Sequence, residues 1–194
     1  LLSLLIWLPV LGGVIAVAID GDRYPQRARI TALITCLVTL ALCIPLYLDF
    51  NPALSRMQFQ ENIPWISVYN INYSLGIDGI SLPLILLTIF TTLLVILAAW
   101  RSVTLRVAQY MAAFLMMQGM MVGTFAATDS ILFYVFWEAI LIPMYLSIGV
   151  WGSDNRSYAS IKFFLYTFFG SALMLIALLY LGVHNPQQNF LIAS

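Results

Sequence analysis

The chain has 194 residues and a formal net charge of zero at pH 7, with 62% hydrophobic and only 8% charged residues. Soluble domains carry about 25% charged residues, so this composition is typical of a membrane protein. The balanced charge argues against nucleic-acid binding, which needs a surplus of basic residues. We therefore expect an all-α fold, a polytopic bundle of transmembrane helices whose surroundings are a lipid bilayer.

Six apolar segments are long enough to cross a bilayer, which takes about 20 residues. They lie at 2–19, 30–48, 80–100, 107–128, 130–150 and 160–182. We divide the chain into residues 1–106, which hold the first three spans, and residues 107–194, which hold spans four to six. The two cysteines of the second span, Cys36 and Cys43, lie seven residues apart on one helix face. That separation excludes a disulfide within the helix, and packing is the favoured role for both.

Residues 49–79 form the one long connection, and they contain the strand signals of the chain. Pro64 and Asn70 interrupt a stretch of aromatic and β-branched residues, which favours a small β-hairpin or an interfacial layer. Asp78 immediately precedes the third span and Asp129 the fifth. Both are expected to cap the start of a helix.

Small residues in the fourth span indicate close helix packing. Gly119 and Gly123 are separated by three residues, a spacing that lets two helix backbones approach closely. Packing within the chain is favoured over dimerisation. The methionines of this span indicate adaptable packing rather than a metal or cofactor site.

The basic residues define an orientation. Seven of the eight fall at one side of the six-span arrangement, and only Arg56 falls at the other. The positive-inside rule then places links 20–29, 101–106 and 151–159 in the cytoplasm or matrix. The N-terminus and the 49–79 connection are expected outside. The chain begins with leucine and ends without a natural stop, so we expect both ends to be trimmed.

Glu138 is the candidate functional residue, because it is a carboxylate in the middle of the apolar run 131–147. An ionisable group at the centre of a membrane helix costs about 2.5–3.5 kcal/mol on insertion scales, and such groups commonly line ion pathways. Helical spacing places Tyr134, Glu138 and Tyr145 on one face, together with Leu141 and Ile142. A proton-relay carboxylate is one interpretation; a structural glutamate that hydrogen-bonds a neighbouring helix is the other.

Other polar residues are weaker candidates. Pro143 is expected to kink the fifth span because it lacks an N–H. Lys162, the only lysine, is expected in the first turn or so of the sixth span, where it either snorkels to the interface or lies at the mouth of a proton path. His184 follows that span as an interfacial residue. The sequence contains no phosphate-binding glycine loop and no Cys or His ligand set, so we expect no cofactor, no metal and no redox chemistry in this chain.

One region resembles a known family closely. The motifs are Phe136-Trp137-Glu138, Leu141-Ile142-Pro143-Met144-Tyr145, Trp151-Gly152 and Lys162-Phe163-Phe164-Leu165-Tyr166-Thr167, with Leu75-Gly76-Ile77-Asp78-Gly79-Ile80-Ser81-Leu82-Pro83 before the third span. They resemble subunit M of the proton-pumping NADH:quinone oxidoreductase, complex I, whose mitochondrial counterpart is NADH dehydrogenase subunit 4.

The resemblance implies an antiporter-like subunit of about fourteen helices, of which this chain holds the first six. It implies that Glu138 pairs with a lysine on a broken seventh helix and that the partners are other membrane subunits of complex I. It further implies protons as the transported species, in a bacterial plasma membrane or the mitochondrial inner membrane. This chain ends before the seventh helix, so the lysine has to come from a longer chain or a separate polypeptide.

Two alternatives remain from the sequence. A subunit of a multi-subunit Na⁺/H⁺ antiporter shares part of the motifs in 136–167. A purely structural membrane scaffold would use Glu138 as a helix–helix contact.

Overall fold

The structure is a computed structural model that describes residues 1–194 except 20–22, 55, 185–189 and 191–194. Its helices are α1 (Leu2–Ala18), α2 (Pro25–Leu48), α3 (Ser81–Ser102), α4 (Val107–Ala126), α5 (Ser130–Trp151) and α6 (Arg156–His184). Two strands, β1 (Gln58–Ile66) and β2 (Ile71–Ile77), flank a short 3₁₀ turn, η1 (Ser67–Tyr69). Each predicted span corresponds to one helix, and the fold is mostly helical as expected. The predicted hairpin is confirmed.

Among the described residues, four helices are long and apolar enough to cross a membrane by length and composition, namely α2, α3, α5 and residues 156–182 of α6. The remaining two helices, α1 and α4, do not meet these criteria. The α1 helix has 17 residues, and α4 contains two glutamines, Gln109 and Gln118, which lower its hydropathy. These criteria therefore support a coarser statement than six spans, namely a helical bundle with four candidate spans.

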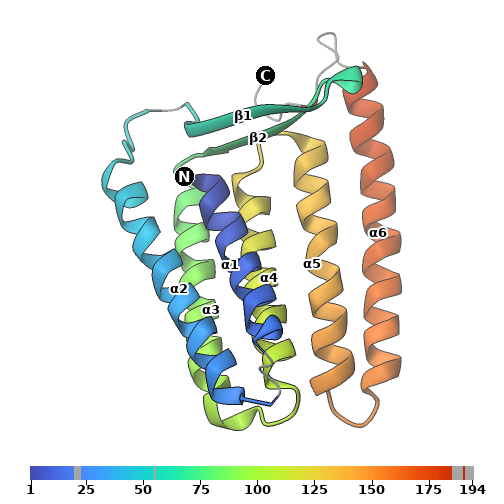
Figure 1. The fold of residues 1–194 in the computed structure, drawn as a ribbon. Helices are drawn as coiled ribbons and strands as arrows, with labels where there is room; N and C mark the ends of the chain where they lie inside the picture. Colours follow the sequence, from blue (N-terminus) through green and yellow to red (C-terminus); the bar gives the residue numbers. More distant parts are fainter. Residues whose placement is uncertain (20–22, 55, 185–189, 191–194) are drawn as a thin grey trace.

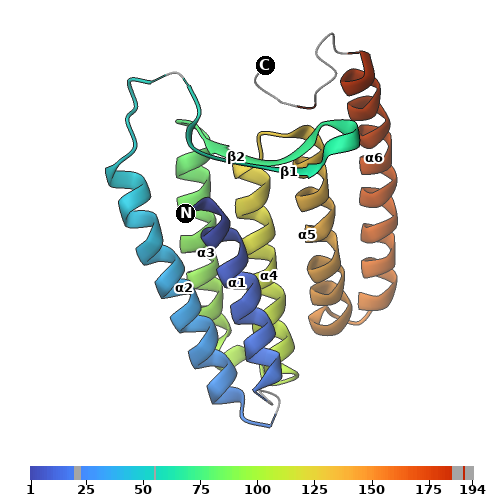
Figure 2. The ribbon, with the colours of Figure 1, turned by 45° about the horizontal axis from the view of Figure 1, so that its top comes forward.

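The helices run alternately up and down, so that the chain's polar connections gather at two ends (Figures 1 and 2). The N-terminus, the hairpin and the α4–α5 turn lie at one end. The start of α2, the α3–α4 turn at 103–106 and the α5–α6 turn at 152–155 lie at the other. The arginines of the second group are therefore clustered at one end of the bundle, as the sequence predicts.

Two predicted links are shorter than expected. The α2 helix begins at Pro25, so Arg27 and Arg29 lie in its first turns rather than in a link that extends to residue 29. Proline suits the first helical position, because its missing N–H has no helical partner there and its φ is already helical. Likewise α6 begins at Arg156, within the predicted link 151–159. Residues 20–22 of the first link lie outside the described residues.

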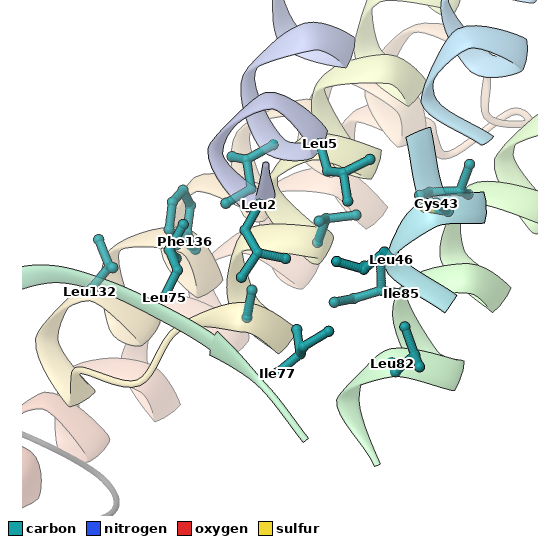
Figure 3. Close-up of a cluster of buried hydrophobic side chains, with 14 residues drawn as sticks. Leu2, Leu5, Cys43, Leu46, Leu75, Ile77, Leu82, Ile85, Leu132 and Phe136 are labelled. Carbon is teal, nitrogen blue, oxygen red and sulfur yellow. The ribbon is translucent and has the colours of Figure 1, made fainter. Parts of the chain in front are cut away.

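The hairpin covers the end of the bundle and contributes to its core. Its strands pair antiparallel, with Asn70 at φ 53° in the left-handed region at the turn, a conformation that asparagine adopts more readily than most residues. Leu75 and Ile77 of β2 are fully buried and point into the helices (Figure 3). They join a cluster that also contains residues of α1 to α5, including Leu2, Leu5, Cys43, Leu46, Leu82, Ile85, Leu132 and Phe136.

Helix α4 lies at the centre of the bundle and packs against α1, α2, α3 and α5. Its two glycines make that packing close. A Cβ atom at Gly119 would overlap the carbonyl oxygen of Ile6 on α1, and one at Gly123 would lie 2.7 Å from the Phe136 ring on α5. The predicted role of these glycines in packing within the chain is therefore confirmed.

We predict that Gly119→Ala destabilises the bundle. Because the new methyl group meets a backbone oxygen, α1 has to move away, at a cost typical of overpacking, about 1–3 kcal/mol. Gly170→Ala is the matched control, since a Cβ there meets nothing within 4 Å, and alanine is the better helix former. The measurement is the thermal unfolding midpoint of the full-length subunit in its native membrane assembly. Equal midpoints for the two variants would contradict the close approach of α1 and α4.

Candidate functional site

The start of α5 is fixed by a buried carboxylate. Asp129 is fully buried and is the N-cap of α5, where its Oδ1 accepts hydrogen bonds from the N–H groups of Ile131 (2.9 Å) and Leu132 (3.2 Å). Its Oδ2 accepts a third bond from the N–H of Asn72 on β2 (3.2 Å). The predicted cap is confirmed, and it also ties α5 to the hairpin.

Asp78 stabilises the start of α3 in a similar way. Its Oδ1 accepts hydrogen bonds from the N–H groups of Ile80 (3.0 Å) and Ser81 (2.7 Å). The bond from Ser81 is the main cause that lowers the pKa of Asp78. The formal N-cap position is Ile80, two residues later than the sequence predicts.

Glu138 lies about 12 Å along α5 from its first residue, at 1.5 Å per residue. Its side chain is half-buried, and Oε1 is buried without a hydrogen-bond partner among the described residues. The one ion pair that the described residues form is between Glu61 and the amino group of Leu1. Glu138 therefore has no basic partner in the part of the chain that the structure describes.

The neighbours of Glu138 are hydroxyl groups and rings of α5 and α6. The Tyr134 side chain, one turn earlier, interacts with both Glu138 and Ser171 of α6. Tyr145, two turns after Glu138 on the same predicted face, packs edge-on against Phe164 of α6, with ring centroids 5.7 Å apart. The side of α5 that carries Tyr134 and Tyr145 therefore faces α6. The side chains described beside Glu138 are uncharged.

The predicted face of α5 is buried at one edge and exposed at the other. Leu141 is buried, but Ile142 is 62% exposed. The two residues are about 100° apart around the helix, so they lie at opposite edges of the face that contains Glu138. The Leu141 edge of this face is therefore buried, whereas the Ile142 edge is open.

Pro143 is buried inside α5, which continues unbroken through it. Because proline has no N–H, the carbonyl of Ala139 loses its usual helical donor. The Ser147 hydroxyl donates to the Pro143 carbonyl (2.8 Å). The predicted kink stays a prediction.

Lys162 does not approach Glu138. It is the seventh residue of α6, nearly two turns into the helix, because α6 begins at Arg156 rather than at residue 160. Its Nζ lies 5.6 Å and 5.8 Å from the ring centroids of Tyr158 and Tyr166. These three side chains line an outward-facing groove on α6. His184 lies at the exposed end of α6, where its Nδ1 is 2.9 Å from the Tyr180 carbonyl.

Two polar residues in the helices escaped the sequence reasoning. Ser171 is 5% exposed and contacts the Tyr134 side chain, and Gln118 of α4 is fully buried. Both have a local signal that could have identified them, because each is a polar residue in a long apolar segment. Among the described residues no group of three Cys, His, Asp or Glu side chains could hold a metal ion.

Comparisons with known proteins place the chain in a family. The family described as NADH-ubiquinone oxidoreductase chain 4, amino terminus, matches residues 28–128. The chain belongs to this family. A second family, described as NADH:quinone oxidoreductase/Mrp antiporter, TM, matches residues 127–191. The resemblance drawn from the motifs in 136–167 is therefore confirmed, and the chain is an integral membrane protein.

Curated relatives carry the same family name. NADH-quinone oxidoreductase subunit M of Rhodobacter capsulatus is 44% identical over 181 residues, covering 92% of this chain and 35% of the relative. NADH-ubiquinone oxidoreductase chain 4 of Arabidopsis thaliana is 41% identical over 179 residues, covering 92% and 36%. The chain thus spans little more than a third of the length of these relatives.

Solved structures agree with the fold. A chain of respiratory complex I from Thermus thermophilus with bound NADH matches with a TM-score of 0.84 and 26% identity, covering 98% of this chain and 38% of that one. A chain of the Mrp complex from Dietzia matches with a TM-score of 0.81 and 13% identity, covering 100% and 20%. At that identity the second match shows the fold alone.

Proposed function

We propose that the chain is the amino-terminal part of a proton-translocating, antiporter-like membrane subunit of NADH:quinone oxidoreductase, complex I. Other subunits of the complex carry out NADH oxidation and quinone reduction, and this chain takes part in the coupled proton transport. The family match and the relatives named subunit M and chain 4 support this function. Because those relatives are bacterial and mitochondrial, the membrane is a bacterial plasma membrane or a mitochondrial inner membrane.

The observation that carries the proposal is the state of Glu138. Its Oε1 is buried, and the described residues supply neither a hydrogen bond to that atom nor an ion pair to the carboxylate. Desolvation favours the neutral form of a carboxyl group, whereas a nearby cation favours the carboxylate. A carboxyl that alternates between these surroundings takes up and releases a proton. Glu138 is therefore the proposed proton-relay group.

The cation has to come from outside the described residues. The arginines lie at helix ends or in turns, and Lys162 faces away between two tyrosines. The family resemblance nominates a lysine on a seventh helix. Tyr134, Tyr145 and Ser171 provide hydroxyl groups or ring edges beside this relay, and other membrane subunits of complex I are the expected partners.

The alternatives differ in measurable ways. A subunit of a Na⁺/H⁺ antiporter has a matching fold, but the Mrp match shows the fold alone. The match of residues 28–128 to the family described as NADH-ubiquinone oxidoreductase chain 4, amino terminus, favours complex I. Co-purification with NADH-oxidising subunits separates these two functions. A structural scaffold predicts that Glu138 is dispensable for transport.

The topology that accompanies this function has six spans, the N-terminus and hairpin outside, and the arginine-rich end inside. We predict that single cysteines at positions 56 and 154 are labelled from opposite sides of the membrane. Position 56 lies next to the hairpin and position 154 in the α5–α6 turn. The test uses a background in which Cys36 and Cys43 are replaced, and membrane-impermeant thiol reagents. Labelling of both positions from the same side would contradict the arrangement.

Lys162→Arg is predicted to leave proton translocation nearly unchanged. Arginine keeps the charge and a long apolar stem, and it stacks on aromatic rings at least as well as lysine. Proton uptake and NADH:quinone turnover of the assembled complex are the measurements. A large loss of pumping with normal assembly would make Lys162 part of the relay.

Glu138→Gln is predicted to abolish proton translocation while the complex still assembles, because glutamine keeps the shape but cannot exchange the proton. Glu138→Asp is predicted to keep a reduced part of the activity. The matched control is Asp154→Asn, which makes the same chemical change at an exposed turn. The measurement is NADH-driven proton uptake in vesicles, with assembly checked on native gels. Full pumping by an assembled Glu138→Gln complex would leave Glu138 a structural contact and reject the relay.

A further inference from the structure

Gln118 of α4 is a fully buried amide whose hydrogen bonds are half complete. Its Oε1 accepts a hydrogen bond from the Cys36 thiol of α2, at 3.3 Å. Its Nε2, which carries two donor hydrogens, has no partner among the described residues. If the amide were turned around, Oε1 would take the unpartnered place instead. Either orientation leaves one polar amide atom of Gln118 in need of a ligand.

The same side chain forms part of a groove between α3 and α4 with a volume of about 310 Å³. Most of the groove is apolar, with leucine, valine, phenylalanine and methionine side chains. Its polar groups are Gln118 and three threonines of α3, namely Thr88, Thr91 and Thr92. Thr88 and Thr92 are 7% and 9% exposed, so both threonines are buried, as Gln118 is.

The threonine hydroxyls are arranged as acceptors. Thr88 Oγ1 donates to the Leu84 carbonyl (2.8 Å), and Thr92 Oγ1 donates to the Thr88 carbonyl (2.9 Å). Each hydroxyl has one hydrogen, so both oxygens retain lone pairs for a further donor. The groove therefore has an amide donor on α4 and hydroxyl acceptors on α3.

We propose that Gln118, Thr88 and Thr92 bind an ordered water molecule that joins α3 to α4. Water accepts a hydrogen bond from the amide and donates to the hydroxyls, which gives it the two to four polar partners that buried waters have. A lipid acyl chain fills an apolar groove but offers no acceptor to the amide. A water molecule is also small beside the groove, since its share of liquid volume is about 30 Å³.

This site is separate from the one that contains Glu138, and it does not rest on the proposed function. Gln118 contacts α2 and borders a groove with α3, whereas the side of α5 that carries Glu138 is directed at α6. The water has a structural role: it completes a polar contact that runs from Cys36 through Gln118 to α3.

The direct test is a map of the intact complex at a resolution that shows ordered waters. We expect density about 2.7–3.2 Å from the Gln118 amide and within hydrogen-bond distance of a threonine hydroxyl. The same density should be missing from a Gln118→Met complex. A resolved map with no density there, or with a lipid chain or a side chain of another subunit at the amide, would overturn the proposal.

Stability gives a second test, because its sign differs between the two cases. If water completes the amide, Gln118→Met removes satisfied hydrogen bonds and lowers the unfolding midpoint, by about 2–4 °C. If the Nε2 group is unsatisfied, Gln118→Met loses only the weak hydrogen bond from the Cys36 thiol and relieves a buried unpaired donor, so the change is neutral or stabilising. A neutral or raised midpoint would therefore contradict the water site. Met117→Leu is the control, since it changes the same groove without a polar atom.

A double-mutant cycle connects the two sides of the site. Thr92→Val removes the hydroxyl and keeps the side-chain shape. The shifts in midpoint from Gln118→Met and Thr92→Val should be clearly less than additive, because both changes remove the same bridge. Additive shifts would mean that no shared water joins the two helices.

Discussion

The arrangement of the bundle depends on Asp129, a carboxylate with no exposed surface. A buried charge is costly unless polar groups surround it, and here three backbone N–H groups do so, from Ile131, Leu132 and Asn72. Two of these donors belong to the first turn of α5, where helices have unpaired N–H groups, and the third belongs to β2. One side chain thereby satisfies a helix start and attaches the hairpin to it.

The neighbouring residue reinforces this attachment. Thr128 donates from its N–H to the Ser74 carbonyl (2.9 Å) and from its hydroxyl to the Ser74 Oγ (2.7 Å). Leu75 of β2 forms an isolated bridge with Ala127, so three consecutive residues of the α4–α5 turn contact β2. The depth of α5 below the hairpin is fixed in this way, and with it the depth of Glu138. The close packing of α4 against α1 and α5 fixes the position of α5 across the bundle.

Local patterns predicted the features that local physics determines. The lengths of the apolar segments predicted the six helices that the described residues form. The capping roles of Asp78 and Asp129 follow from residue type beside a helix start. The bond from Asn72 to Asp129 joins residues far apart in the sequence, and no periodicity contains such a contact. The exposure of Ile142 is a related case, because how much of a helix face is buried depends on where the neighbouring helices lie, which the pattern of α5 alone does not specify.

Whether a polar side chain within a helix was recognised from the sequence depended on its charge. Glu138 was identified because a charge in an apolar run is conspicuous, and none of the described residues pairs a cation with it, which is consistent with an expected partner elsewhere. Gln118 and Ser171 are neutral, so they were overlooked among the other residues of their helices. Their importance became visible only through their neighbours, Cys36 for the amide and Tyr134 for the serine.

Glu138 and Gln118 each have a buried polar atom without a hydrogen-bond partner among the described residues, but burial costs a carboxylate more than an amide, and that difference separates the roles proposed for them. A neutral amide needs only hydrogen bonds, which are worth about 0.6–2 kcal/mol between membrane helices, and one water with two hydroxyls can provide them. A carboxylate at mid-membrane depth costs about 2.5–3.5 kcal/mol on the lowest scales, and hydroxyl dipoles such as Tyr134 and Ser171 do not cancel its charge. Only a bound proton or a nearby cation neutralises the charge of the carboxylate. A residue that needs one of the two, and can exchange them, is suited to transport, whereas an amide completed by water is suited to holding helices together.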